Sequence, residues 1–164
     1  MTVDSFWEWS LARYRCTSTR SLLLSLQSAA DLVIVEALFA AWLGSRQFGW
    51  QSSAVDRMRF ATDDWVEKVV LPLRMTRGQW KSDERLRRPR EHLLQLEVQA
   101  EHHLAQLIWS GVMDSPESPV DVVKVPAQPT HYLMEINLAR LSPFYDGNNV
   151  RELKQLVALL SQPT

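Results

Sequence analysis

The chain has 164 residues, of which 46% are hydrophobic, and its 18 Lys and Arg against 19 Asp and Glu give a net charge of −1. This length and composition predict one globular domain over residues 1–164 and exclude a chain that is disordered throughout. The near-neutral charge argues against a general affinity for nucleic acid or acidic membranes, although a local cluster of charge can still form a patch.

The N-terminal segment has the pattern of a short helix. Ser5 and Glu8 have the spacing of a capping box, and Asp4 adds negative charge at the same helix start. We therefore predict a helix over residues 6–15. The following residues 16–20 are rich in Thr and Ser, which favours a turn.

The segment from Leu22 to Leu43 is the most apolar part of the chain, with Asp31 and Glu36 as its charged side chains. When residues are set 100° apart, the first half keeps a polar arc, whereas from Leu32 onward apolar groups point all round the axis. This pattern predicts one long buried helix at the centre of a bundle, ending at or shortly after Gly44. Glu36 is then a buried or interfacial carboxylate that needs a partner, for which we expect an arginine or a Trp or Tyr donor.

A membrane span of about the same length is the alternative reading of this segment. Two charges near its middle carry a high insertion cost, and no second apolar run of similar length exists to pair with it. We therefore expect a bundle helix and no membrane association.

The region after the central helix is predicted to begin with a loop over residues 48–53. A third helical region then starts near Ala54 and restarts at Asp64, which begins a second capping spacing. Pro72 falls inside this helical pattern. Because proline removes a hydrogen bond and clashes with the preceding turn, we expect a kink or break near residues 68–71.

A strongly basic helical pattern continues over residues 73–86, and a further helix is predicted over residues 90–113, after Pro89. Residues 114–129 contain four prolines and little periodicity, which favours an extended strap over a strand. Helical signals return at residues 130–141 and again at 149–160. Together the elements predict an all-α single domain, a bundle of about five helices around the central one.

The densest charged feature lies in residues 74–90. Four of its cations have helical spacing and would line one helix face beside Trp80: Arg77, Lys81, Arg85 and Arg88. A solvated surface whose arginines pair with neighbouring acids explains this pattern without a function. Phosphate neutralisation with base stacking on the tryptophan, or docking to an acidic protein, are the functional alternatives.

Acids and histidines cluster in the run that contains Glu97, Glu101, His102 and His103. A carboxylate-bridged di-metal bundle needs a Glu-x-x-His pair on each of two helices, and this spacing is absent. We therefore expect no metal or other cofactor. Glu97 and Glu101 are predicted to lie on the exposed side of their helix and to pair with arginines.

Enzymatic activity has no positive support in the sequence. The lone Cys16 is more typical of a small buried hydrophobe than of a nucleophile, and it excludes an intramolecular disulfide. No glycine-rich phosphate loop, G-x-S-x-G elbow or H-E-x-x-H motif occurs. Without a signal-peptide pattern, we expect the protein to lie in the cytoplasm.

Seven tryptophans are more than a chain of this length usually contains. Trp7 and Trp9 are two residues apart and cannot share one helix face, so one of them is expected near the surface or an interface. Tryptophan and arginine dominate the energetic centres of protein interfaces, and the position of Trp80 among arginines therefore favours a binding surface.

Several short segments together resemble a small family of proteobacterial proteins of unknown function. The segments, which cover most of the chain up to about Met113, are FWEWSLARY at 6–14, LSLQ at 24–27, LFAAWLG at 38–44, WVEKVVLPLR at 65–74, EVQAE at 97–101 and INLARL at 136–141. The resemblance implies a compact, helical, cytoplasmic bacterial protein and transfers no activity. In the family pattern a glycine and then Asp-Val-Asn follow the LSLQ segment, where this chain has Asp31, Val33, Ile34 and Val35. This part of the chain is therefore more apolar than in the family pattern, and Glu36 is the last acid in it.

The leading hypothesis is a non-enzymatic protein-interaction or regulatory module, which uses the basic face around Trp80 or the apolar surface near Trp7. Its partner would be another protein or a second copy of the chain. Nucleic-acid binding through residues 74–90 is the first alternative. A small-molecule or metal site at Glu36, between helices, is the second.

Overall fold

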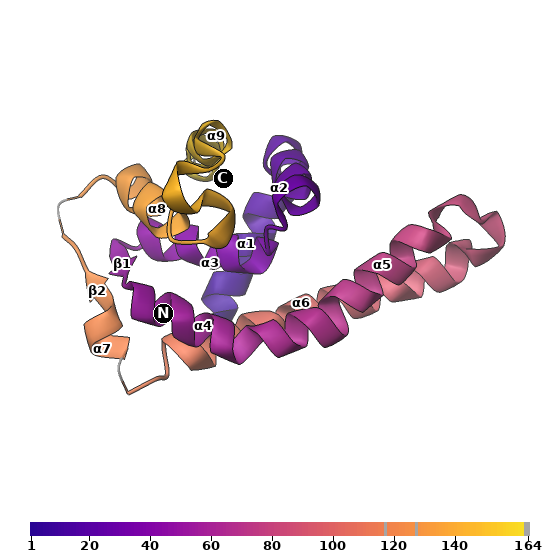
Figure 1. Ribbon diagram of the computed structural model, residues 1–164, viewed down its shortest axis with the longest axis horizontal. Helices are drawn as coiled ribbons and strands as arrows, with labels where there is room; N and C mark the ends of the chain where they lie inside the picture. Colours follow the sequence, from indigo (N-terminus) through magenta and orange to yellow (C-terminus); the bar gives the residue numbers. More distant parts are fainter. Residues whose placement is uncertain (117, 127, 163–164) are drawn as a thin grey trace.

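The structure, a computed structural model, describes residues 1–116, 118–126 and 128–162. It is 81% helical, which confirms the all-α class, and its helices outnumber the five or so that the sequence predicted. In chain order the elements are α1 (Val3–Arg15), α2 (Thr17–Ala30), α3 (Ile34–Ser45), β1 (Phe48–Trp50), α4 (Ser52–Trp65), η1 (Val66–Val70), α5 (Leu71–Gln79), η2 (Trp80–Ser82), η3 (Glu84–Leu86), α6 (Arg87–Val112), α7 (Ser118–Asp121), β2 (Val122–Lys124), α8 (Thr130–Leu138), η4 (Ser142–Gly147) and α9 (Val150–Leu160). Most of them form a body, from which α5 and the start of α6 project together (Figure 1).

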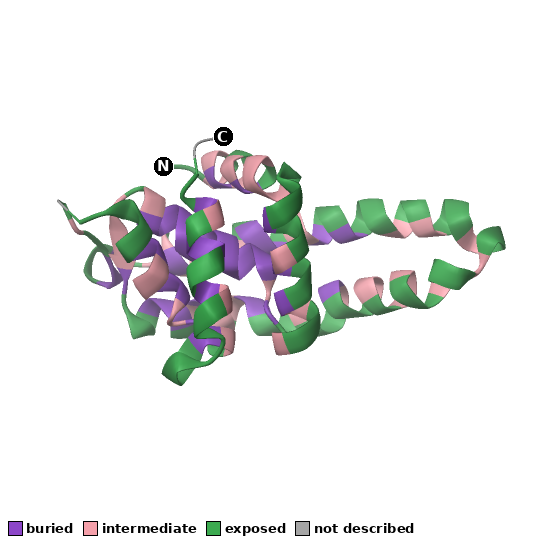
Figure 2. Ribbon diagram, turned by 90° about the horizontal axis from the view of Figure 1, so that it is seen from above, coloured by how far each residue is buried: buried purple, intermediate pink, exposed green. Residues whose placement is uncertain are grey.

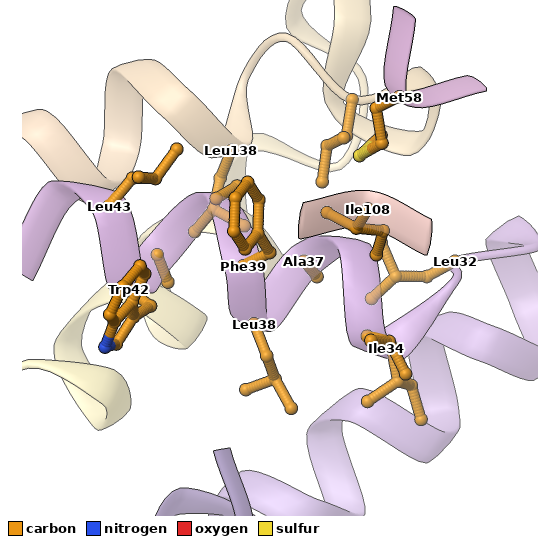
Figure 3. Close-up of a cluster of buried hydrophobic side chains, with 14 of the residues drawn as sticks. Leu32, Ile34, Ala37, Leu38, Phe39, Trp42, Leu43, Met58, Ile108 and Leu138 are labelled. Atoms are coloured by element: carbon orange, nitrogen blue, oxygen red, sulfur yellow. The ribbon is translucent and has the colours of Figure 1, made fainter. Parts of the chain in front are cut away.

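Helix α3 occupies the centre of the body. Every residue from Ile34 to Gly44 is buried, including Phe39 and Trp42, which are wholly inaccessible to solvent (Figure 3). Helix α8 lies so close that a Cβ atom on Gly44 would come within 2.5 Å of the backbone nitrogen of Met134. Glycine is therefore required at this crossing, where two helix backbones approach each other directly.

The predicted central helix over Leu22 to Leu43 is wrong in one respect, because the structure divides it into α2 and α3. Asp31 ends α2 in the left-handed conformation, with φ 52° and ψ 33°, and Val33 is extended ahead of α3. Apolar periodicity continues across the break, so the pattern gave no signal for it. Aspartate tolerates the left-handed region better than most residues, and the family pattern carries a glycine at this point. The predicted end near Gly44 is confirmed, since α3 ends at Ser45.

The first helix is confirmed, but its start differs from the prediction. Thr2 and Ser5 form the capping box, in place of Ser5 and Glu8, and α1 therefore begins at Val3. The predicted turn over residues 16–20 is wrong. Cys16 alone separates α1 from α2, and the Thr and Ser residues that suggested a turn form the first turn of a helix.

A small sheet corrects the prediction of a strap without strands. β1 pairs with β2 antiparallel, in the register Phe48↔Lys124, Gly49↔Val123 and Trp50↔Val122. The predicted loop over residues 48–53 thus contains a strand, and the proline-rich connection over 114–129 contains α7 and β2. Positions 117 and 127 of this connection lie outside the described residues. Each strand has three residues, too few for an alternating pattern to predict.

The buried Asn137 explains how β1 is held against the body. Its side-chain amide donates to the backbone oxygens of Ala40 and Phe48, at 3.1 and 2.9 Å. The backbone and indole N–H groups of Trp50 donate to Asn137 Oδ1 and to its backbone oxygen, at 3.3 and 3.1 Å. One asparagine of α8 therefore joins α3 and β1, and it satisfies polar groups that burial would otherwise leave unpaired.

Pro72 is accommodated within a continuous helical rod. The five residues of η1 form a π-helical segment, in which the backbone N–H of Leu71 donates to the oxygen of Val66. This wider turn lies next to the missing N–H and the bulky ring of the proline. The predicted kink near residues 68–71 is therefore confirmed as a local change of helix type. The restart predicted at Asp64 does not occur, because α4 runs on into η1.

The arm, defined here as residues 71–96, consists of α5, the short turns η2 and η3, and the first part of α6. It extends away from the body as a helical hairpin, and exposed residues cover most of its length (Figures 1 and 2). None of its residues is buried. The predicted helices over 90–113, 130–141 and 149–160 are confirmed as α6, α8 and α9.

Candidate binding site

Two arginines of α5 and two glutamates of α6 meet at the base of the arm. Spacings of three and four residues put Arg74 and Arg77 on one side of α5 and Glu97 and Glu101 on one side of α6. The Nε atom of Arg74 lies 3.2 Å from Glu97 Oε1, and its Nη2 lies 3.1 Å from Glu101 Oε1. Arg77 donates to both oxygens of Glu97. These four side chains, the charge cluster, connect the two helices of the arm where it leaves the body.

Glu97 lies at the centre of the charge cluster, and its side chain is only 6% exposed. The prediction that Glu97 and Glu101 lie on the exposed side is therefore wrong. Burial raises the pKa of Glu101, and the hydrogen bond to Glu97 raises the pKa of Arg77. The sequence could not show this arrangement, because it depends on α5 folding back along α6.

The predicted basic row does not form one helical face. Helix α5 ends at Gln79, and the following residues form the turns η2 and η3, so the helical spacing is broken after Arg77. Arg77 is bound in the charge cluster, and Arg85 pairs with Asp83 at 2.7 Å. Lys81 and Arg88 are exposed at the tip of the arm, and Trp80 is half-buried there.

Charge is nevertheless strongly segregated between the arm and the body. The arm carries seven Lys and Arg against three Asp and Glu, a net charge of +4. The remaining residues carry 11 Lys and Arg against 16 Asp and Glu, a net charge of −5. The near-neutral total thus conceals a basic projection on an acidic body, which gives the molecule two faces of opposite potential.

A pocket opens where the charge cluster meets the body, and we call it the Trp7 pocket. It occupies about 720 Å³, including its mouth, between α1, α2, α3 and the base of the arm. Its walls are mainly apolar, with Trp7, Leu11, Leu24, Leu38, Leu94 and Val98 among them. Polar side chains also line it, namely Ser10, Tyr14, Gln27, Arg77, Glu97 and Glu101. Mostly apolar walls with a few convergent polar groups are typical of small-molecule sites.

Trp7, which the sequence placed near a surface or an interface, is half-buried in this pocket. Its ring lies 4.8 Å from the ring of His102 on α6. Trp9 is also half-buried, on another side of α1, where the guanidinium of Arg13 lies 5.2 Å from its ring centre. The two tryptophans therefore serve different surroundings, as their spacing predicted.

Glu36 faces a second, more polar groove between α3, α4 and the segment before α9. It is 9% exposed, and Thr62 Oγ1 donates to its Oε1 at 3.4 Å. The predicted arginine, Trp or Tyr partner is therefore wrong, because a threonine of α4 supplies the hydrogen bond. Burial, followed by the charge of Asp63, raises the pKa of Glu36 to about 7, and Arg59 opposes this shift.

Cys16 and the histidines form no cluster that could bind a metal. Cys16 is exposed, and its hydrogen bond to Ser18 at 3.2 Å lowers the pKa of the thiol to about 7. His103 lies against Trp65, with 4.5 Å between ring centres. Among the described residues, no group of three or more His, Cys, Asp and Glu side chains could hold a metal ion. Within the same part of the chain, no helix is both long and apolar enough to cross a membrane.

Comparison with known proteins matches one family. Residues 5–108 match the model of a family described as "Protein of unknown function (DUF2390)". No curated protein matches the chain, and no solved structure matches it. The matched range contains α1 to α5 and most of α6, and it therefore includes the Trp7 pocket, the charge cluster and the whole arm.

Proposed function

The chain belongs to the DUF2390 family of proteins of unknown function, and we propose that it is a non-enzymatic protein-interaction module. In this proposal the arm docks onto an acidic surface of a partner protein. The observation that carries it is the arm itself, a 26-residue helical hairpin (71–96) without a buried residue. A two-helix projection buries too little apolar surface to be explained by the stability of the fold.

The apolar side chains on the arm support this role. Leu71, Met75, Leu94 and Leu96 are exposed, Met75 by 63%. These residues alternate with arginines along both helices. Methionine and arginine are enriched in protein interfaces, where apolar contacts supply affinity and charges supply orientation. The arm therefore offers both kinds of contact on one surface.

The charge of the arm favours an acidic partner. A net charge of +4 on a projecting hairpin attracts a negative surface over a distance and raises the rate of encounter. The acidic body, with −5, would orient the same partner toward the arm. A second copy of this chain also has an acidic body, so self-association is one outcome that the test must separate.

Nucleic-acid binding through residues 74–90 is less well supported. Arg74 and Arg77 are bound to glutamates in the charge cluster, and Arg85 is bound to Asp83. Phosphate neutralisation would have to break these pairs or rely on the few remaining cations at the tip. The small-molecule or metal site at Glu36 is supported by the groove and by the raised pKa, and it has no second ligand group of matching geometry among the described residues.

The test is affinity capture at low salt with a charge-reversed arm. The variant Lys81→Glu, Arg85→Glu, Arg88→Glu is compared with Arg15→Glu, Arg151→Glu, Lys154→Glu, which makes the same change of charge at exposed positions of the body. We expect a defined protein that the wild type and the body variant retain and the arm variant loses. Equal retention by all three would overturn the proposal. Nuclease-sensitive retention would favour nucleic acid, and capture of the chain itself, with a doubled mass in sedimentation, would favour self-association.

We also propose that the module acts in the bacterial cytoplasm. The single cysteine with an exposed thiol, and the resemblance to proteobacterial proteins, support this location. Fractionation of cells that express the full chain tests it, because recovery with a periplasmic or membrane marker would contradict it.

A further inference from the structure

The Trp7 pocket contains a buried hydroxyl group without a partner. Ser10 is 3% exposed, and its Oγ has no hydrogen-bond partner among the described residues. A serine within a helix usually donates to the carbonyl four residues earlier, and this serine does not. Because an unsatisfied buried polar group costs stability, such a group in a pocket points to a ligand that satisfies it.

Further polar groups converge on the same pocket. Tyr14 and Gln27 line it, and neither side chain has a hydrogen-bond partner in the described part of the chain. Arg74 occupies Oε1 of Glu101, and no described residue donates to Oε2. The pocket therefore offers hydroxyl and amide donors together with carboxylate and amide acceptors.

The charges around the pocket cancel. Arg74 and Arg77 carry two positive charges against the two negative charges of Glu97 and Glu101, and they are paired with each other. An anionic head group would meet the glutamates, and a cationic one would meet the arginines. Either ion would lose its hydration without gaining a net opposite charge. A neutral polar head avoids this cost.

We propose that the Trp7 pocket binds a small neutral amphipathic molecule. Its apolar body lies between the leucine and tryptophan walls, and its hydroxyl or amide head bonds to Ser10, Tyr14 and Glu101. The volume of about 720 Å³ is in the range of small-molecule sites. This site is separate from the outer surface of the arm, and it does not depend on the proposed protein partner.

Ligand binding would also connect the arm to the body. The walls of the pocket come from α1, α2 and α3 on one side and from Leu94, Val98 and the charge cluster on the other. A molecule that contacts both sides stabilises their relative position, because it binds the assembled pocket more strongly than an opened one. Bound ligand should therefore slow hydrogen exchange in residues 71–96.

The test uses three probes with one tail and three heads, namely 1-octanol, octanoate and octylammonium, titrated into the full chain by calorimetry. We expect 1-octanol to bind at one site and about tenfold more tightly than either ion. Equal affinity for the three heads, or no binding of 1-octanol, would overturn the proposal.

Two variants identify the site. Ser10→Ala should weaken 1-octanol binding about three- to tenfold and at the same time raise the melting temperature of the free protein, because it removes an unpaired hydroxyl. A lower melting temperature with unchanged affinity would show that Ser10 is structural and would contradict the proposal. Leu24→Trp fills the pocket from its rim and should abolish binding. The matched control Val150→Trp, at a position of similar exposure on α9, should bind like the wild type.

Discussion

Helix α3 and the arm are stabilised in opposite ways. From Ile34 to Gly44, α3 has no exposed residue, and it is surrounded by apolar side chains of the body. The arm has no buried residue, and its two helices are joined at the base by paired charges (Figure 2). Apolar burial therefore determines the body, whereas a few polar contacts position the arm. A segment of the second kind keeps its surface available for other molecules.

Two glycines give the sharpest test of this difference. Gly44→Ala should destabilise the protein by about 3–4 kcal/mol, because the new Cβ would overlap the backbone of Met134, which cannot move aside as a side chain could. Gly78→Ala, near the end of α5, meets no atom within 4 Å and should stabilise by about 0.5–1 kcal/mol.

Chemical denaturation at equilibrium measures both changes. A similar effect of the two substitutions would show that the arm is packed as tightly as the body. Stabilisation by Gly44→Ala would contradict the close approach of α3 and α8.

Glu36 is the exception within the apolar helix, and it should make stability depend on pH. Its pKa is raised from 4.5 to about 7, so the folded protein holds this proton more tightly than the unfolded chain. The free energy of unfolding should therefore fall by about 3 kcal/mol as the pH rises from about 4.5 to above 7.

Glu36→Gln should remove this slope. The variant should gain about 3 kcal/mol relative to the wild type between pH 4.5 and pH 8, as measured by urea denaturation at each pH. Glu67→Gln, an exposed acid of η1, serves as the control and should leave the slope unchanged. Parallel curves for the wild type and Glu36→Gln would contradict the burial of this carboxyl group.

The arm depends on Glu97 in the way that the body depends on apolar contacts. Glu97→Gln leaves the guanidinium groups of Arg74 and Arg77 without their shared carboxylate. The two arginines are 20% and 27% exposed, which reduces the expected loss to about 2 kcal/mol. Thermal and urea unfolding compare this variant with Glu91→Gln, an exposed acid of the same helix. Equal stability of the two variants would mean that the charge cluster contributes little.

The smallest effect is expected at the start of α3. Asp31→Gly should stabilise by about 1 kcal/mol, because glycine adopts the left-handed conformation without the steric cost that aspartate carries. Asp31→Asn tolerates the same backbone and removes only the charge, so it separates the two causes. If Asp31→Gly lowers the melting temperature, the left-handed turn between α2 and α3 is not the source of strain.

Much of the fold could be predicted from the sequence, because it follows from local patterns. Helical periodicity gave the class, the long α6, and the two C-terminal helices α8 and α9. The effect of Pro72 was also predictable, since a proline inside a helix has a defined consequence. Apolar periodicity could not show the break at Asp31, because the same side chains are buried on either side of it.

The candidate site could be predicted only in part. Trp7 was identified as a surface or interface residue from its spacing to Trp9, and it lines the pocket. The partners of Glu97 and Ser10 depend on contacts between helices that lie far apart in the chain. For the same reason the basic row was wrong, since nothing in its spacing indicated that α5 ends at Gln79 and that Arg77 turns to Glu97.

Native-state hydrogen exchange tests most directly whether the arm and the body are stabilised separately. With increasing denaturant, the amides of α5 and of the first part of α6 should open at a lower free energy than those of α3, and Glu97→Gln should lower protection in the arm alone. If the arm and α3 share one exchange free energy and one denaturant dependence, and Glu97→Gln affects both equally, the two regions form a single cooperative unit and the account is contradicted.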